Sequence, residues 1–159
     1  MSTLNQLYNT AYTAIWEDDS ARTAQQRYLE IIAELRHVDS GVLQTCRMMF
    51  LPNDSYLAHF AGSEICYPEF GCYSSPKECI WVNQLIIPIT NVVEEVKGFA
   101  AFHPFNYATA KETGDKTITY YSYSARDVFD KNKFLYCPGD SYRKALADGY
   151  MFLVDGVFD

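Results

Sequence analysis

Two long apolar runs in the middle of the chain constrain the fold more than any other feature. Residues 80–89 are nearly all apolar, and residues 92–103 form a second β-type run after a polar break at Thr90 and Asn91. Apolar runs between turn residues are typical of buried strands, and a short break between two of them favours a hairpin. The sequence therefore predicts a central β-hairpin.

Two amphipathic patterns precede this hairpin. Residues 4–16 and residues 21–36 carry apolar side chains every three or four positions, which predicts two helices. Thr3 and Gln6 match a capping box at the first helix, and acidic residues precede the second. The predicted apolar stripe of the second helix consists of Ala24, Tyr28, Ile31, Ile32 and Leu35.

Shorter patterns complete the predicted order of elements. The residues favour strands at 42–51, 117–124 and 150–154, a hairpin at 128–136, and a short helix that begins at Asp140 or Ser141 and ends before Gly149. This order predicts an α+β fold, in which the two N-terminal helices pack on one face of a mainly antiparallel, curved sheet of about six strands. A cone-like sheet around an aromatic pocket and a closed barrel are both open alternatives.

The size and the cysteine content of the chain indicate its class. With 159 residues, the chain has the length of a single domain that spans residues 1–159. The N-terminal residues lack the basic stretch and apolar run of a signal peptide, and no apolar run approaches transmembrane length. The five cysteines include no C-x-x-C pair, unlike a disulfide framework or a zinc site. We therefore expect a soluble, cytoplasmic protein with reduced thiols.

Charge and aromatic content limit the classes of partner that we expect for this chain. Thirteen Lys and Arg residues against twenty Asp and Glu residues give a net charge of −7, which repels phosphate backbones and anionic lipids at long range. Neither nucleic acid nor a membrane is therefore expected as a partner. Aromatic residues make up 16% of the chain, and such rings fill a core, line a pocket or cover a partner.

One stretch carries a pattern known from catalysis. In residues 92–98, Glu95-x-Lys97 places both side chains on one face of a strand. This pair resembles the catalytic strand of the PD-(D/E)xK nuclease superfamily. The resemblance implies that Glu95 holds a divalent cation such as Mg²⁺, that Lys97 steadies the attacking water, and that Glu69 and Glu30 supply further acids. The competing interpretation is a Glu-Lys pair on a solvated strand face.

A histidine and several tyrosines form a second set of candidates. Alternation along the strand predicted at 92–103 puts His103 on the same face as Glu95 and Lys97, where it would sit at the mouth of a pocket. The tyrosine-rich strand predicted at 117–124 puts Tyr121 and Tyr123 on one face. The predicted ligand-binding or partner-binding residues are His103, Tyr107, Tyr121 and Tyr123.

No strong catalytic motif accompanies these candidates. The sequence contains no phosphate-binding glycine loop, H-E-x-x-H, G-x-S-x-G or dinucleotide fingerprint. The predicted function is a noncatalytic binding or regulatory domain that uses an aromatic-rich face or pocket for a protein partner or a small ligand, without a cofactor or metal. The alternatives are a metal-dependent, PD-(D/E)xK-like nuclease that uses Mg²⁺ and a small pocket enzyme built on a cone-like sheet.

Overall fold

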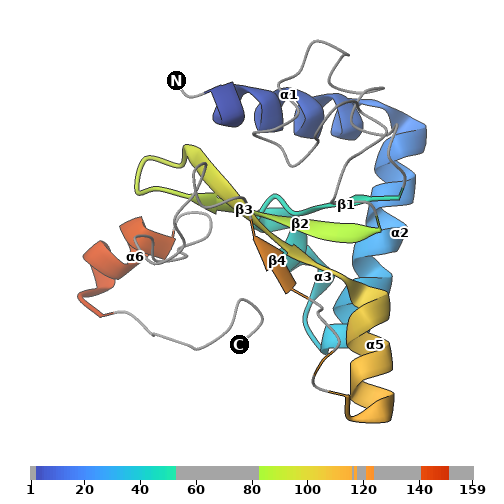
Figure 1. The fold of residues 1–159 in the computed structure, drawn as a ribbon. Helices are drawn as coiled ribbons and strands as arrows, with labels where there is room; N and C mark the ends of the chain where they lie inside the picture. The colour runs from blue at the N-terminus through green and yellow to red at the C-terminus, as the bar shows by residue number, and fades with distance from the viewer. Residues whose placement is uncertain (1–2, 53–82, 116, 118–120, 124–140, 151–159) are drawn as a thin grey trace.

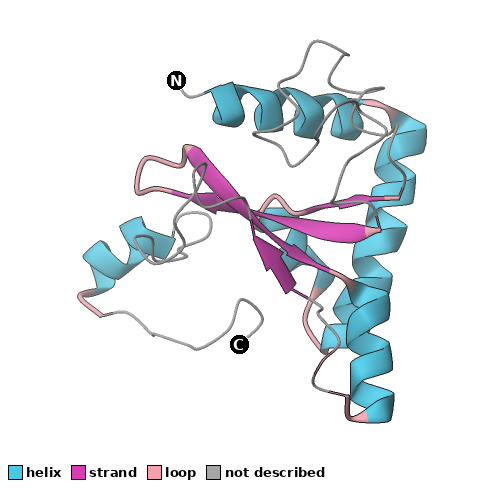
Figure 2. Cartoon of the chain, viewed as in Figure 1, coloured by secondary structure: helices cyan, strands magenta, loops and turns pink. Residues whose placement is uncertain are grey.

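The computed structural model describes residues 3–52, 83–115, 117, 121–123 and 141–150, which form five helices and four strands (Figures 1 and 2). In chain order these are α1 (Thr3–Glu17), α2 (Asp19–Arg36), α3 (Ser40–Thr45), β1 (Met49–Leu51), β2 (Gln84–Thr90), β3 (Val96–Phe102), α5 (Pro104–Thr113), β4 (Tyr121–Tyr123) and α6 (Ser141–Asp148). The predicted α+β class is confirmed. Within these residues, no helix has the length and apolar character needed to cross a membrane.

Both leading helices form where the sequence predicts them. Asp18 begins α2, because its side chain accepts a hydrogen bond from Ala21 N at 2.8 Å. The helix ends at His37, which has a left-handed φ of 57°. Val38 N then donates to Ala33 O at 3.0 Å, so the last turn of the helix keeps its carbonyl groups bonded.

The buried stripe of α2 differs from the predicted one. Ile31 is 55% exposed, whereas Ile32 is buried. The stripe is rotated by about one residue, because the polar side chain of Gln25 is buried where the apolar pattern favoured Ala24. The buried residues of this helix are Ala21, Gln25, Leu29, Ile32 and Ala33.

The four strands form one antiparallel sheet in the order β1-β2-β3-β4. The predicted central hairpin is confirmed, since β2 pairs with β3 in a register that sets Ile87 opposite Ala100. β1 and β4 lie at the two edges of the described sheet, which is open, so the closed barrel is wrong. The hairpin predicted at 128–136, and all but Tyr150 of the strand predicted at 150–154, lie outside the described residues.

A helix replaces the first part of the strand predicted at 42–51. The side chain of Asp39 accepts a hydrogen bond from Gly41 N at 2.7 Å and so caps α3. Only Met49–Leu51 pair as a strand. Val42 and Leu43 are compatible with either structure, and the cap at Asp39 favours the helix.

The two leading helices cover opposite faces of the sheet, so the prediction that both pack on one face is wrong (Figure 1). α1 covers the face that carries Met49 and Leu51 of β1, and α2 with α3 covers the face that carries Phe50. Successive residues of a strand point to opposite faces. A nearly all-apolar strand such as β2 therefore has two faces to bury, and each face takes one helical layer.

Gln25 of α2 bonds to the main chain of the edge strand β1. Its Oε1 accepts from Phe50 N at 2.9 Å, and its Nε2 donates to Phe50 O at 2.6 Å. Gln25 is fully buried. Both polar groups of one strand residue are thus satisfied by a single amide, as buried main-chain groups require.

Candidate functional site

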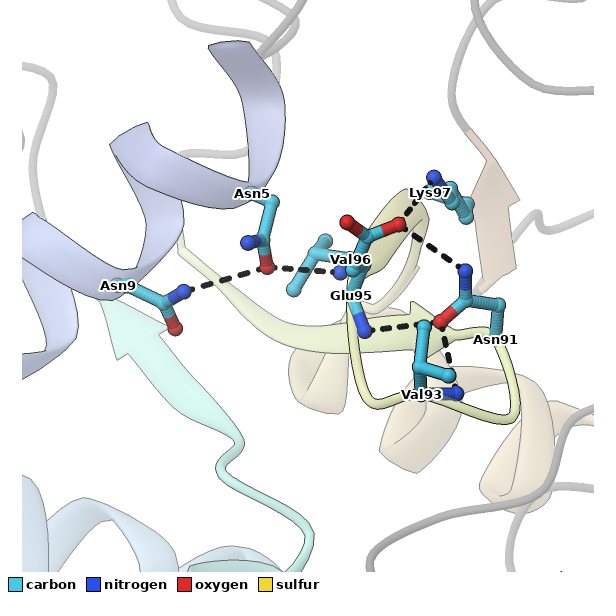
Figure 3. A network of polar contacts seen from close by, with 7 residues as sticks. All are labelled: Asn5, Asn9, Asn91, Val93, Glu95, Val96 and Lys97. Atoms are coloured by element: carbon cyan, nitrogen blue, oxygen red, sulfur yellow. Dashed lines mark hydrogen bonds and ion pairs between the residues drawn. The ribbon is translucent and has the colours of Figure 1, made fainter. Parts of the chain in front are cut away.

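The turn between β2 and β3 holds the predicted Glu-Lys pair (Figure 3). Lys97 Nζ lies 2.7 Å from Glu95 Oε2, and the same oxygen accepts from Asn91 Nδ2 at 3.1 Å. Asn91 Oδ1 in turn accepts from Glu95 N at 2.9 Å and from Val93 N at 3.1 Å. Asn91 therefore organises the turn and positions the carboxylate that pairs with Lys97.

The electrostatics of this pair stabilise the charged form of the acid. Hydrogen bonds from Lys97 and Asn91 lower the pKa of Glu95, and the Lys97 charge acts in the same direction. The side chains of Glu95 and Lys97 are 33% and 30% exposed. This geometry matches the competing interpretation, a Glu-Lys pair on a solvated face.

The other acids of the nuclease resemblance do not join this pair in the described structure. Glu30 is exposed on α2, and Glu69 lies outside the described residues. Across the described part of the chain, no group of three or more His, Cys, Asp or Glu side chains is placed to hold a metal ion.

A buried asparagine ties the start of β3 to α1 (Figure 3). Asn5 is 4% exposed, and its Oδ1 accepts from Val96 N at 2.9 Å and from Asn9 Nδ2 at 3.2 Å. The register between β2 and β3 shifts beside this point, between Ile89 and Thr90. Asn5 therefore satisfies the main-chain donor at the irregular end of the hairpin and positions the Glu-Lys pair relative to α1.

His103 does not share a strand face with that pair, so this prediction is wrong. β3 ends at Phe102, and His103 is the N-cap of α5, where its Nδ1 accepts from Asn106 N at 3.3 Å. Pro104 occupies the first turn and favours the start of a helix. Because Glu95 and His103 flank opposite ends of the seven-residue β3, about 25 Å separates them along the strand direction. Burial lowers the pKa of His103, which favours the neutral ring that its capping role requires.

An arginine and two rings meet where α2, β3 and α5 come together, and a pair of rings, His103 and Phe105, lies at the start of α5. We call these five residues the α5 corner. The Arg36 guanidinium carbon lies 4.2 Å from the Tyr107 ring centroid and 5.4 Å from that of Phe102. Phe102 and Tyr107 also contact each other, with centroids 5.4 Å apart. His103 and Phe105 meet edge to face at 6.0 Å, and Phe105 is 63% exposed. The α5 corner therefore has an exposed aromatic ring, Phe105, at the start of α5, and an arginine that lies over the ring of Tyr107 in the same helix.

Two predicted tyrosines belong to the strand next to this corner. The backbone register of β4 sets Tyr121 opposite Phe102 and Tyr123 opposite Ala100. Their side chains lie outside the described part of the chain. β4 therefore approaches the α5 corner through its backbone, next to the end of β3.

Sequence reasoning missed Arg36, Phe105 and the whole of α5. A signal for the helix was present, because Pro104 stands at its start and Gly114, with a φ of 69°, ends it. Proline near the start of a segment and glycine just after its end is typical of a helix. No comparable signal links Arg36 to Tyr107, which are far apart in the sequence.

Comparison with known proteins identifies the fold. Neither a known protein family nor a curated protein matches the sequence. Solved structures that match include the DnaG primase catalytic domain bound to ssDNA, at 20% identity and a TM-score of 0.59. They also include the zinc-binding and RNA polymerase domains of the Aquifex aeolicus primase, at 18% identity and a TM-score of 0.64. A third match is the RNA polymerase domain of Mycobacterium tuberculosis primase DnaG, at 18% identity and a TM-score of 0.59.

These matches span almost all of the present chain and less than half of each primase chain. They cover 92%, 98% and 91% of the present chain, and 44%, 36% and 47% of the respective primase chains. The likeness therefore concerns one part of the larger primase structures.

The same likeness corrects the predicted function and partners. The matched structures are primase domains, and one of them is bound to ssDNA. The expectation of a noncatalytic regulatory domain for a protein partner or small ligand is therefore wrong, as is the expectation that nucleic acid is not a partner. The nuclease-like and cone-like alternatives gain no support from these matches. At this level of identity the likeness establishes the fold alone, and the chain has the fold of part of a primase catalytic domain.

Proposed function

We propose that the chain binds single-stranded nucleic acid as part of a primase-type catalytic unit. The observation that carries the proposal is the likeness to primase domains over 91–98% of the chain, with one of those domains bound to ssDNA. The match covers less than half of each primase chain. Primer synthesis by this chain is therefore itself part of the proposal.

The α5 corner is the surface that best suits this ligand among the described residues. Proteins bind single strands by stacking bases on aromatic rings and by placing cations near the phosphates. Phe105 offers an exposed ring, His103 contacts that ring edge to face, and Arg36 is the cation of the α5 corner. We therefore assign base stacking to Phe105. We retain His103, Tyr107, Tyr121 and Tyr123 as proposed neighbours of the bound single-stranded nucleic acid.

Because the net charge is −7, the salt concentration is the condition that matters most when this binding is measured. Long-range repulsion weakens an acidic protein's attraction for phosphate, whereas stacking acts at contact and is insensitive to salt by comparison. The first experiment measures fluorescence anisotropy of labelled oligo(dT), duplex DNA and single-stranded RNA at low and at physiological salt. We expect single strands to bind more tightly than duplex DNA.

A matched pair of variants tests the proposed surface. Because stacking contributes about 1–3 kcal/mol per base, Phe105→Ala should weaken oligo(dT) binding by about 5-fold to 150-fold. Ile31→Ala is the control, since Ile31 is an apolar side chain of similar exposure, 55%, on α2. No binding of any single strand at low salt would refute the proposed function. Equal affinities for the two variants would leave binding in place and refute the α5 corner as its surface.

The extent of the sheet is a further part of the proposal. The β-type patterns at 128–136 and 150–154 support additional strands, for a total of about six in a single domain. Backbone chemical shifts of the labelled protein would test this, with helical shifts in either segment as the contrary result.

A further inference from the structure

A second arginine is held against aromatic rings on the α1 side of the sheet. Arg47 lies in the loop between α3 and β1, and its guanidinium carbon is 4.8 Å from the Tyr12 ring centroid and 5.9 Å from that of Tyr8. Its Nη2 donates to Asn9 Oδ1 at 2.6 Å. We call Asn9, Tyr12 and Arg47 the α1 arginine site.

The main chain of Arg47 is fixed as well as its side chain. The residue has a left-handed φ of 56°. Its N–H donates to Gln44 O at 2.8 Å, and its carbonyl oxygen accepts from the Tyr8 hydroxyl. The Tyr12 hydroxyl donates to Gln44 O at 3.4 Å. The guanidinium is therefore held in place before any ligand arrives, which reduces the entropy cost of binding.

The chemical environment of this guanidinium suits an anion. Its contacts are a neutral amide and two neutral rings, and burial raises the pKa of Tyr12, so that ring stays uncharged. In the part of the chain that the structure describes, Arg22, Lys97 and Arg143 have carboxylate partners, and no carboxylate lies within ion-pair distance of Arg47. A guanidinium presents five N–H donors in a planar fork that matches phosphate, and Asn9 uses one group of that fork.

We propose that the α1 arginine site is a phosphate contact for single-stranded nucleic acid. This inference rests on the proposed function. It adds a contact with the nucleic acid at α1, in addition to the contact proposed at the α5 corner. Tyr12 and Asn9 are positioning residues that hold the guanidinium, and Arg47 touches the phosphate. A purely structural role, in which Arg47 only fastens its loop to α1, predicts normal binding by any folded variant.

The salt dependence of binding separates these roles. Each phosphate contact with a single strand contributes about 0.7 to the slope of log affinity against log salt concentration. Arg47→Gln should reduce the slope for oligo(dT) by about that amount. Arg27→Gln is the matched control, because it removes the same charge from an exposed position on α2. The strand should have roughly 20 nucleotides, so that it exceeds the roughly 4–16 nucleotides that small single-strand-binding folds occupy.

Each result of this experiment has a defined meaning. A wild-type chain that binds no single strand overturns the proposed function, whatever the variants do. A wild-type chain that binds, with equal slopes for Arg47→Gln and Arg27→Gln, overturns only the α1 arginine site. If Arg47→Gln does not fold, the side-chain resonances of ¹⁵N-labelled arginines in the wild-type protein replace it. A shift of the Arg47 signal on addition of oligo(dT) supports the contact, and an unchanged signal at saturation refutes it.

Discussion

Replacing Gln25 should destabilise the protein more than replacing any neighbouring polar residue of α2. Gln25→Met keeps the length of the side chain and removes both hydrogen bonds to Phe50. Each buried main-chain group left without a partner costs about 1–3 kcal/mol, so the two together should cost about 2–6 kcal/mol. The thioether also buries more favourably than an amide, which places the expected value in the lower half of that range.

Urea unfolding, followed by circular dichroism, measures this cost. With a slope of about 1–3 kcal/mol per molar urea, a loss of about 2–4 kcal/mol should lower the midpoint by roughly 0.7–4 M. Gln26→Met is the control, because Gln26 is exposed one position further along the same helix and should change stability by no more than about 0.5 kcal/mol. Equal midpoints for the two variants would mean that the Gln25 amide does not hold the edge strand.

Two further predictions follow from burial and from the cap of α5. Ile32→Ala should lower the free energy of unfolding by about 2–5 kcal/mol, whereas Ile31→Ala should lower it by no more than about 0.5 kcal/mol. Similar urea midpoints for the two variants would contradict the observed orientation of α2. Because the pKa of His103 is lower in the folded protein than in the unfolded chain, its contribution to stability is present above about pH 6.5 and is lost as the pH falls through the folded pKa. His103→Asn keeps a capping side chain and should remove that part of the pH dependence, and an unchanged profile of melting temperature against pH would argue against a titrating cap.

The parts of the fold that follow from local patterns could be predicted from the sequence. The helices α1, α2 and α6 and the β2-β3 hairpin depend on periodicity and turn residues that lie close together in the chain. Errors arose where a polar side chain decided the structure. Gln25 rotated the buried stripe of α2, and Asp39 capped a helix where β-compatible residues indicated a strand.

The candidate site could be predicted only where its members are close in the sequence. Glu95 and Lys97 meet because residues two apart in an extended chain share a face. The contact of Arg36 with Tyr107 and the contact of Arg47 with Tyr12 each join separate elements, and their formation depends on how helices pack on the sheet. The sequence predicted both leading helices on one face of the sheet, whereas they cover opposite faces, so these contacts could not be predicted.

Net charge was the least informative guide to the partner. A total of −7 sums all residues of the chain, whereas a single strand contacts a few side chains within about 10 Å, the distance over which salt screens charges. Arg36 and Arg47 both lie over aromatic rings, so two cations of this acidic molecule are held against rings. In such a molecule the rings have to supply a larger share of the affinity than they do in a basic protein. Binding by this chain should therefore depend less steeply on salt than binding by a basic protein that neutralises many phosphates.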